Sequence, residues 1–238
     1  MNVMEFIREY KMTLKTIQLL LVLMLLSSLS ACAQHDNQKV PQMVKSEVIN
    51  KNKTMNIEKT IDTVTFGAGC FWCVEAIFQQ LKGVSSVTSG YSGGTVANPT
   101  YKDICTGTTG YAEVAQIVYD PKVISFPELL EAFWSSHDPT TLNRQGADVG
   151  TQYRSVIFYH DDEQKELAEK YKKELNASGA FKSPIVTEIK PFDKFYKAED
   201  YHQDYFNSNQ DAPYCQFVIA PKLEKFKKVF HDKLIVNP

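Results

Sequence analysis

The chain has 238 residues, of which 43% are hydrophobic, and its formal net charge is -2. This length and hydrophobic content suit one globular domain with a full core, and the near balance of charge gives no electrostatic reason to expect nucleic acid as a partner.

The first thirty residues have the pattern of an export signal. Arg8, Lys11 and Lys15 precede an apolar run over residues 17–26. That run is too short to span a bilayer comfortably, and small residues follow it. We therefore expect residues 1–31 to be a signal peptide, with an uncleaved membrane anchor as the alternative. Both interpretations place the domain outside the cytoplasm.

The signal segment ends in Leu29-Ser30-Ala31-Cys32, which resembles the lipobox of bacterial lipoproteins. The cysteine of a lipobox becomes the lipid-modified first residue of the mature chain. We therefore expect an exported lipoprotein, anchored through Cys32 to a membrane of the cell envelope or periplasm. Residues 32–60 are rich in Gln, Asn, Lys and Ser and contain too few large apolar residues to fold, so they predict a flexible tether. Residues 61–238 remain as the folded domain.

Within that domain, apolar runs that predict strands alternate with segments in which apolar residues recur at helical spacing. The predicted strands cover residues 62–68, 84–91, 112–119, 153–159 and 185–189, and the predicted helices cover residues 71–81, 125–136 and 162–178. The core order β-α-β-β-α-β predicts an α+β fold, a two-layer α/β sandwich on the ferredoxin-like plan. The C-terminal tail is expected to be irregular and to turn helical at Pro221.

Cys70 lies where the first predicted strand ends and the first predicted helix begins. At a helix N-terminus, unpaired backbone N–H groups and the helix dipole favour an anion, and thiolate is the nucleophilic form of cysteine. Cys70 is therefore a candidate reactive thiolate. A buried structural cysteine is the alternative.

Four cysteines belong to the domain: Cys70, Cys73, Cys105 and Cys215. An even number in an exported chain permits two structural disulfides, but a domain with an ample apolar core does not need them. Redox chemistry is the preferred interpretation.

A long glycine-rich segment connects the second and third predicted strands. A loop of this length without structure of its own is commonly functional, although a flexible surface loop is the alternative. Glu113 follows it, near the start of an otherwise apolar strand. Burial there would raise the pKa of its carboxyl and make it a proton donor, whereas a solvated carboxylate at the strand edge would be inert.

Seven motifs together resemble peptide methionine sulfoxide reductase A, in the order of that family and across most of the folded part. They are Gly69-Cys70-Phe71-Trp72, Gly90-Tyr91-Ser92-Gly93-Gly94, Asn98-Pro99-Thr100-Tyr101, Gly110-Tyr111-Ala112-Glu113, His137-Asp138-Pro139, Gly150-Thr151-Gln152-Tyr153-Arg154-Ser155 and Tyr201-His202-Gln203. The resemblance implies an enzyme that reduces the S epimer of methionine sulfoxide, free or within proteins, and it implies no cofactor. One departure is Tyr111, where some members carry His; it leaves the acid assignment standing.

The resemblance also implies roles for single residues. Cys70 would attack the sulfoxide sulfur and Glu113 would protonate its oxygen, because an unprotonated oxygen is a poor leaving group. Tyr101 and Tyr153 match phenol donors to that oxygen. Asp148 matches an acidic residue that helps to fix the site. Phe71 and Trp72 would form the wall of the pocket that receives the methyl group of the substrate.

After oxygen transfer Cys70 would be a sulfenic acid, which a second thiol can convert to a disulfide. Cys215 matches the C-terminal resolving cysteine of the family, and we expect it to act first because an irregular tail over residues 207–213 can carry its thiol to the sulfur. Cys73, in a Cys-x-x-Cys arrangement, is the alternative. Cys105 is expected to pack structurally. A thioredoxin-like donor outside the cytoplasm would reduce the disulfide, and the enzyme is expected to be a monomer.

Two other functions fit part of the pattern. A thioredoxin-fold oxidoreductase would use Cys70 and Cys73, but it would not need the glycine-rich loop or the strand that carries Glu113. A zinc-binding module would use Cys70, Cys73, Cys215 and His202, but it lacks a second close pair of cysteines.

Overall fold

The computed structural model describes residues 60–235. The predicted signal peptide, Cys32 and all but the last residue of the predicted tether lie outside the described residues. All the described residues belong to one compact unit. Within residues 60–235, no helix has the length and apolar content needed to cross a membrane.

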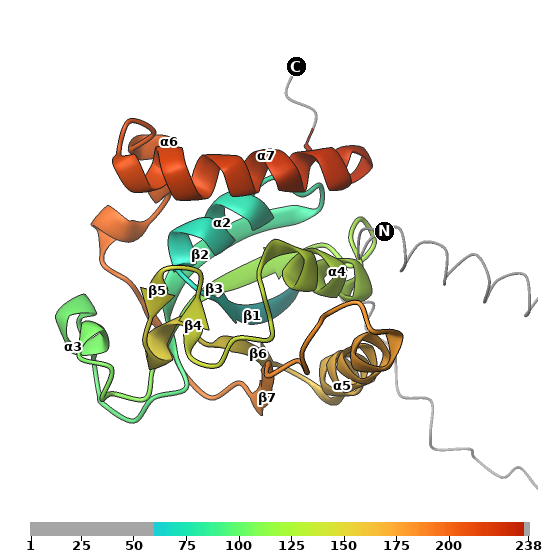
Figure 1. Cartoon of the computed structure of the whole chain (residues 1–238), viewed down its shortest axis with the longest axis horizontal. Coiled ribbons are helices and arrows are strands. Elements are labelled where there is room, and N and C mark those ends of the chain that lie inside the picture. Colours follow the sequence, from blue (N-terminus) through green and yellow to red (C-terminus); the bar gives the residue numbers. More distant parts are fainter. Residues whose placement is uncertain (1–59, 236–238) are drawn as a thin grey trace, which may run out of the picture. The chain divides into compact units, whose positions relative to one another are not determined.

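The elements of the predicted core are all present, in the predicted order (Figure 1). The strands are β1 (Asp62–Ala68), β2 (Val84–Ser92), β3 (Ala112–Tyr119), β6 (Ser155–Tyr159), β7 (Glu188–Pro191) and β8 (Phe195–Lys197). The helices are α2 (Phe71–Phe78), α3 (Tyr101–Cys105), α4 (Phe126–Ser136), α5 (Asp162–Ser178), α6 (Tyr205–Ser208) and α7 (Ala220–Val229). A small hairpin is formed by β4 (Arg144–Gln145) and β5 (Asp148–Val149).

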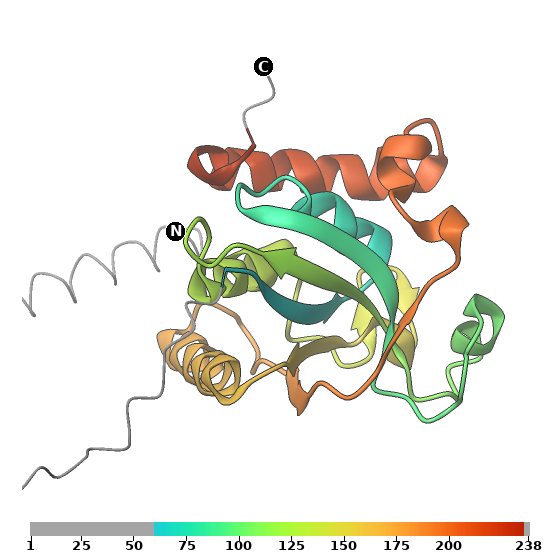
Figure 2. The same ribbon diagram turned by 180° about the vertical axis from the view of Figure 1, so that it is seen from behind.

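The six longer strands form one mixed sheet in the order β7-β6-β1-β3-β2-β8. Every neighbouring pair is antiparallel except β6 and β7, which are parallel. Helices α2 and α4 lie over one face, and Figure 2 shows the strands in front of them from the other side. The α+β class is therefore confirmed.

Phe66 of β1 joins the sheet to the helices. Its ring lies 5.5 Å from that of Phe78 in α2 and 4.7 Å from that of Phe133 in α4, measured between ring centroids. Phe66 is opposite Ala115 in β3. Since side chains alternate between the two faces of a sheet, Glu113 lies on this helix-covered face as well.

The other face of the sheet is also buried. Ala112, Val114, Val156 and Phe158 form a second apolar cluster, against which Phe192 and Phe195 from the segment after β7 pack. The strands that flank the site are therefore covered on both faces.

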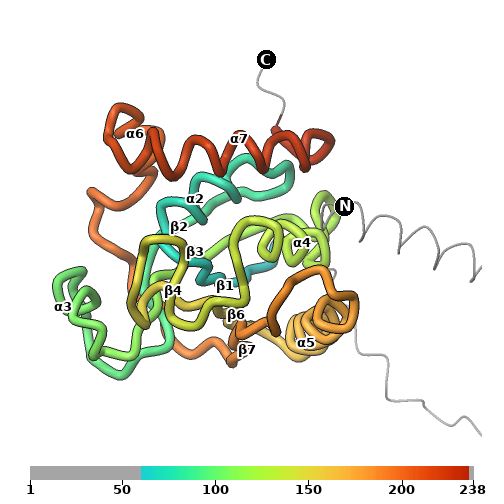
Figure 3. Tube along the Cα trace, viewed as in Figure 1, coloured from blue at the N-terminus to red at the C-terminus, as the bar shows by residue number. Residues whose placement is uncertain are grey.

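The C-terminal segment differs from the prediction. After β8 the chain runs to α6 and then doubles back alongside α2 as α7, as the trace in Figure 3 shows. Helical structure begins at Pro213 and includes a π-helical segment, Cys215–Ile219, that continues directly into α7. Cys215 therefore lies in a helix and not on an irregular tail.

Other differences are local. The first helix ends at Phe78 and not at residue 81, and the strand predicted from residue 153 begins at Ser155 because Thr151–Tyr153 form a 3-10 turn. The glycine-rich segment contains α3. The last predicted strand, residues 185–189, is found as β7 at Glu188–Pro191.

Candidate active site

Cys70 occupies the N-cap position of α2, as predicted. Its carbonyl oxygen accepts hydrogen bonds from the N–H groups of Cys73, at 3.1 Å, and Val74, at 3.4 Å. Its side chain is buried, with 8% of its surface exposed. Gly69 permits the turn before it, because its φ of +92° lies in a region that residues with side chains rarely adopt.

The predicted preference of Cys70 for the thiolate form is wrong for the resting protein. Burial raises the pKa of its thiol well above the ordinary value, and the hydrogen bond with Cys73 and the nearby carboxyl of Glu113 raise it further. These effects outweigh the dipole of a helix that has only eight residues. The folded environment of the resting site therefore disfavours the thiolate of Cys70.

The neighbouring thiol, Cys73, ionises more readily than Cys70. Its pKa is lowered to about 7, first because the thiol of Cys70 donates to its thiolate, and further by the positive charge of Lys222 and the nearby hydroxyl of Tyr214. Burial and Asp148 oppose this shift. Since the two thiols interact directly, they share the first deprotonation of the pair.

Glu113 is the buried carboxyl of the site, with 1% of its surface exposed. Its Oε2 accepts a hydrogen bond of 3.1 Å from the backbone N–H of Phe71, the first residue of α2. Burial raises the pKa of Glu113 to about 8, and the negative charges of Asp148 and Cys73 add to the rise. At neutral pH the carboxyl is therefore protonated. Its hydrogen-bond partner, Phe71, directly follows Cys70 in the chain.

Two tyrosines flank this pair. Tyr101 begins α3, and its N–H donates to Glu199 Oε1 over 2.8 Å. Tyr153 ends the 3-10 turn before β6. Burial and the charge of Glu113 raise the pKa of both phenols above the ordinary value, so both keep their protons and remain hydrogen-bond donors.

Asp148 and Tyr214 close the site from two distant parts of the chain. Tyr214 Oη donates to Asp148 Oδ2 over 2.7 Å, and the same oxygen can accept a hydrogen bond from the thiol of Cys70. The role of Tyr214 is not predicted by the sequence, although this residue immediately precedes Cys215. No local pattern distinguishes it, because its partners lie in α2 and β5.

The aromatic wall next to Cys70 is held from the C-terminal side. The ring of Trp72 stacks on Tyr205 with centroids 3.6 Å apart, and its Nε1–H donates to His202 Nδ1 over 3.2 Å. Phe71 is fully buried, with its ring centroid 5.0 Å from that of His202. Trp72 is only half-buried. The wall thus has one packed side and one accessible side.

Other residues of the seven motifs have structural roles. His137 is buried between the carbonyl oxygen of Phe133, 2.8 Å away, and the hydroxyl of Ser155, 2.7 Å away. Its burial lowers its pKa to about 4, so it is neutral. Tyr111 donates to the carbonyl oxygen of Val96 over 2.7 Å. These contacts fix loops around the site.

All four cysteines of the described residues are free thiols. Cys70, Cys73 and Cys215 belong to one buried cluster, whereas Cys105 is exposed on α3. The expectation that Cys105 packs structurally is therefore wrong. Among residues 60–235, no group of three or more His, Cys, Asp or Glu is arranged to hold a metal ion, so the zinc-binding alternative finds no ligand set there.

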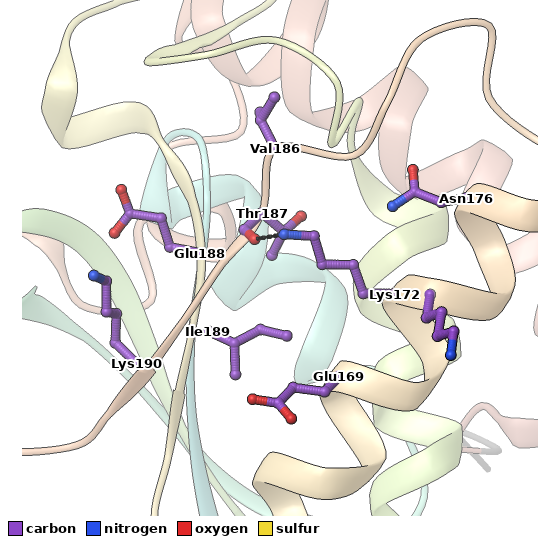
Figure 4. Close-up of a pocket in the computed structure, with 9 residues that line it drawn as sticks. Glu169, Lys172, Asn176, Val186, Thr187, Glu188, Ile189 and Lys190 are labelled. Atoms are coloured by element: carbon purple, nitrogen blue, oxygen red, sulfur yellow. Dashed lines mark hydrogen bonds between the residues drawn. The ribbon is translucent and has the colours of Figure 1, made fainter.

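A cavity of about 620 Å³ lies elsewhere, between α5 and β7 (Figure 4). Lys172 reaches from α5 to the carbonyl oxygen of Thr187 over 2.7 Å, and lysines and glutamates line most of the remainder. None of the predicted site residues lines this cavity.

Comparison with known proteins gives a consistent result. A family model described as peptide methionine sulfoxide reductase matches residues 62–234. A relative from Saccharolobus solfataricus, named peptide methionine sulfoxide reductase MsrA, is 54% identical over 177 residues, which cover 74% of this chain and 99% of the relative. A protein of the same name from Trichodesmium erythraeum is 52% identical over 174 residues, 73% of this chain and 98% of the relative.

Solved structures agree. The reduced form of Mxr1 from Saccharomyces cerevisiae is 37% identical, with a TM-score of 0.61 over 66% of this chain and 90% of that protein. Methionine sulfoxide reductase A of Corynebacterium diphtheriae is 38% identical, with a TM-score of 0.57 over 63% of this chain and 76% of that protein.

Proposed function

The chain belongs to the peptide methionine sulfoxide reductase family, and from that premise we propose how its residues perform the reaction. The chain is a thiol-dependent oxidoreductase that reduces the S epimer of methionine sulfoxide, free or within proteins, to methionine. Its role is the repair of oxidised proteins. The thioredoxin-fold alternative is thereby set aside.

The observation that carries the catalytic assignment is the pairing of Cys70 with Glu113. The same helix N-terminus presents the thiol and binds the carboxyl through the N–H of Phe71. In our proposal the sulfur of Cys70 attacks the sulfoxide sulfur while Glu113 protonates the sulfoxide oxygen. The oxygen passes to Cys70, so a thiol and a sulfoxide become a sulfenic acid and a thioether.

The protonation state of Glu113 serves both partners. A carboxyl with a pKa of about 8 still holds its proton at neutral pH and can donate it. When neutral it also places no negative charge beside Cys70, so the contribution of Glu113 to the raised pKa of that thiol disappears. One neutral acid thus favours both the nucleophile and the leaving oxygen.

The remaining site residues position the substrate. Tyr101 and Tyr153 keep their protons and would donate to the sulfoxide oxygen, and Phe71 and Trp72 would receive the methyl group. Asp148 would act through Tyr214, which it holds at 2.7 Å. A disulfide between Cys70 and a second thiol, reduced by a thioredoxin-like donor, would complete the cycle.

The assignment of Cys70 is tested by Cys70→Ser. A hydroxyl is far less ionised and less nucleophilic than a thiol near neutral pH, so the purified variant should form no methionine from methionine S-sulfoxide with a dithiol as reductant. A variant that retains wild-type turnover, after a mock purification has excluded a contaminating reductase, would refute the assignment.

We further propose that the domain is exported as a monomeric lipoprotein, with residues 1–31 as the signal, Cys32 as the lipid attachment site and residues 32–60 as a tether. The basic residues, the short apolar run and the sequence Leu29-Ser30-Ala31-Cys32 support this proposal.

The ferredoxin-like description of the sandwich is likewise a proposal. It is supported by the strand order β6-β1-β3-β2, with all three pairs antiparallel.

A further inference from the structure

A second buried glutamate lies one turn along α2 from Trp72. This residue, Glu75, has 2% of its surface exposed. Burial raises the pKa of its carboxyl, and the N–H of Asp204 and the hydroxyl of Ser89 oppose that rise. Because a buried carboxyl costs free energy unless hydrogen bonds compensate, the partners of Glu75 indicate what it holds in place.

Glu75 joins α2 to the segment that leads into α6. Its Oε1 accepts a hydrogen bond of 3.0 Å from the backbone N–H of Asp204, which lies 129 positions later in the chain. Its Oε2 accepts one of 3.2 Å from the hydroxyl of Ser89 in β2. Both oxygens of the carboxyl are therefore used, and one of them holds a backbone group of the C-terminal segment.

The segment that Glu75 holds has little support of its own. Helix α6 has only four residues, and a helix this short is not stable by itself. Asp204, its N-cap residue, makes no side-chain capping hydrogen bond, and its φ of +50° lies in the left-handed region that residues with side chains uncommonly adopt. The carboxyl of Glu75 therefore supplies a contact that the segment itself lacks.

Tyr205 directly follows Asp204 and covers the indole of Trp72. The two rings stack with centroids 3.6 Å apart and an angle of 7° between their planes. Glu75 and Trp72 lie three residues apart on α2, which makes them neighbours on the surface of the helix. The hydrogen bond to Asp204 and the stack with Tyr205 therefore link the same two segments, and a shift of Asp204 would move Tyr205 off the indole.

We propose that Glu75 is a positioning residue, which holds Tyr205 against Trp72 through the backbone of Asp204 and so fixes the wall that receives the methyl group of the sulfoxide. The proposal rests on the proposed function, which gives Trp72 that role. Glu75 acts through these residues and takes no part in oxygen transfer. A fixed wall binds the methyl group equally before and during the reaction, so its loss should raise KM and leave kcat nearly unchanged.

The test compares the full chain with Glu75→Met by fluorine NMR, after labelling with fluorotryptophan, and by steady-state kinetics. The chain has two tryptophans, so two resonances are expected, and Trp134→Phe assigns them. Methionine fills the volume of the glutamate but offers no oxygen to the N–H of Asp204. We expect the Trp72 resonance to move or broaden, the KM for methionine S-sulfoxide to rise about 10-fold, and kcat to stay within about 2-fold.

Two further variants grade this effect. Glu75→Gln keeps an oxygen for the N–H of Asp204 but presents a donor to Ser89, so it should change the resonance and KM in the same direction by a smaller amount. Asn207→Ala is the matched control. It removes an exposed hydrogen bond of 2.6 Å to the side chain of Asp204, and not to its backbone, so it should behave as wild type.

A double-mutant cycle with Tyr205→Leu shows whether Glu75 acts through the stacked ring. If it does, Glu75→Met adds little to the KM of Tyr205→Leu. The proposal is overturned if Glu75→Met leaves the Trp72 resonance and KM unchanged, or if the two substitutions raise KM by factors that multiply. If Glu75→Met does not fold, an unchanged resonance and KM in Glu75→Gln overturn the proposal in the same way.

Failure of the proposed function gives a different result. A wild-type chain that releases no methionine from the S-sulfoxide refutes oxygen transfer at this site. The Trp72 resonance does not depend on turnover, so its shift in Glu75→Met still supports the contact through Tyr205, and its constancy still overturns it.

Discussion

The buried, protonated carboxyl of Glu113 sets the pH range in which this site can donate a proton. Glu113 has a single backbone hydrogen bond from Phe71, too little to hold a full negative charge against burial. Its pKa therefore rises to about 8. Below that pH it can donate a proton, and above that pH it cannot.

The first prediction is that Glu113→Gln lowers kcat/KM by about 10²–10⁴-fold, because glutamine keeps a weak hydrogen-bond donor but has no transferable proton. In the wild type, kcat/KM should fall as pH rises through about 8, as the acid loses its proton. The variant should lack this decrease. A pH profile of sulfoxide reduction measures both effects, and a variant that keeps the wild-type decrease would contradict the assignment.

Thermal unfolding of the same variant provides the folding control. The native state keeps the Glu113 proton up to about pH 8, whereas the unfolded chain loses it near the ordinary value of 4.5. Between these values the unfolded state binds fewer protons, so the stability of the wild type decreases as pH rises. Glutamine removes that loss. The variant should therefore gain in Tm relative to wild type between about pH 5 and about pH 8.

The residues that sequence could identify are those with a local pattern. Cys70 stands out because a strand and a helix meet at it, and Glu113 stands out as a carboxyl in an apolar strand. The charge on Cys70 could not be predicted in the same way. It depends on Cys73, Glu113 and burial together, and burial is a property of the folded chain.

At the scale of elements, the turn between β1 and α2 controls where the nucleophile lies. Gly69 has a φ of +92°, and a Cβ added there would lie 2.7 Å from Cβ of Gln145 in β4. Gln145 cannot move away freely, because its side-chain amide donates to the carbonyl oxygen of Asp138 over 3.0 Å. A side chain at residue 69 would therefore displace the turn that carries Cys70.

The second prediction compares Gly69→Ala with Gly179→Ala. Gly179, the C-cap of α5, has a φ of +69° and no atom within 4 Å of an added Cβ, so its substitution should cost only about 1–2 kcal/mol of backbone strain. Gly69→Ala adds a steric clash to the strain and should cost more, roughly 2–4 kcal/mol. It should also lower kcat/KM, which Gly179→Ala should not.

Denaturant unfolding and kinetics on both variants check this prediction. Equal losses of stability, together with full activity in Gly69→Ala, would show that the turn tolerates a side chain and does not position Cys70.

Elements with their own signals could be predicted, and elements that depend on distant contacts could not. Ser125 and Glu128 form the predicted capping box of α4, and α5 spans the predicted residues and ends at Gly179 in a left-handed conformation. By contrast, the two strands of the β4–β5 hairpin have only two residues each, which is too short for an alternating pattern that would predict a strand. The π-helical segment buries Cys215 and Ile219 in one cluster with residues of α2, a contact that the local sequence does not indicate.

At the scale of the whole molecule, the site exists only when three parts of the chain meet. The N-terminal part of the domain supplies Cys70 and Glu113, the middle supplies Asp148 and Tyr153, and the C-terminal segment supplies Tyr214. The hydrogen bond between Tyr214 and Asp148 joins residues 66 positions apart in sequence. Sequence motifs could mark each part, but not the contacts between them.

The third prediction concerns the part of the chain that precedes the domain. If Cys32 is the lipid attachment site, labelled fatty acid fed to cells that express the wild-type chain should appear on this protein, and Cys32→Ala should carry no label. Cys105→Ser serves as the control and should keep the label. An unlabelled wild-type protein whose N-terminus is still Met1 would contradict the proposed anchor.

The central claim is stereospecific oxygen transfer from methionine sulfoxide to Cys70, and competition between the two epimers tests it most directly. The purified chain is given an equal mixture of the S and R sulfoxides with a dithiol, and chiral chromatography follows both. We predict that the S epimer is converted completely to methionine while the R epimer stays unchanged, and that Cys70→Ser consumes neither. Consumption of the R epimer, or of neither epimer by the wild type, would contradict the account.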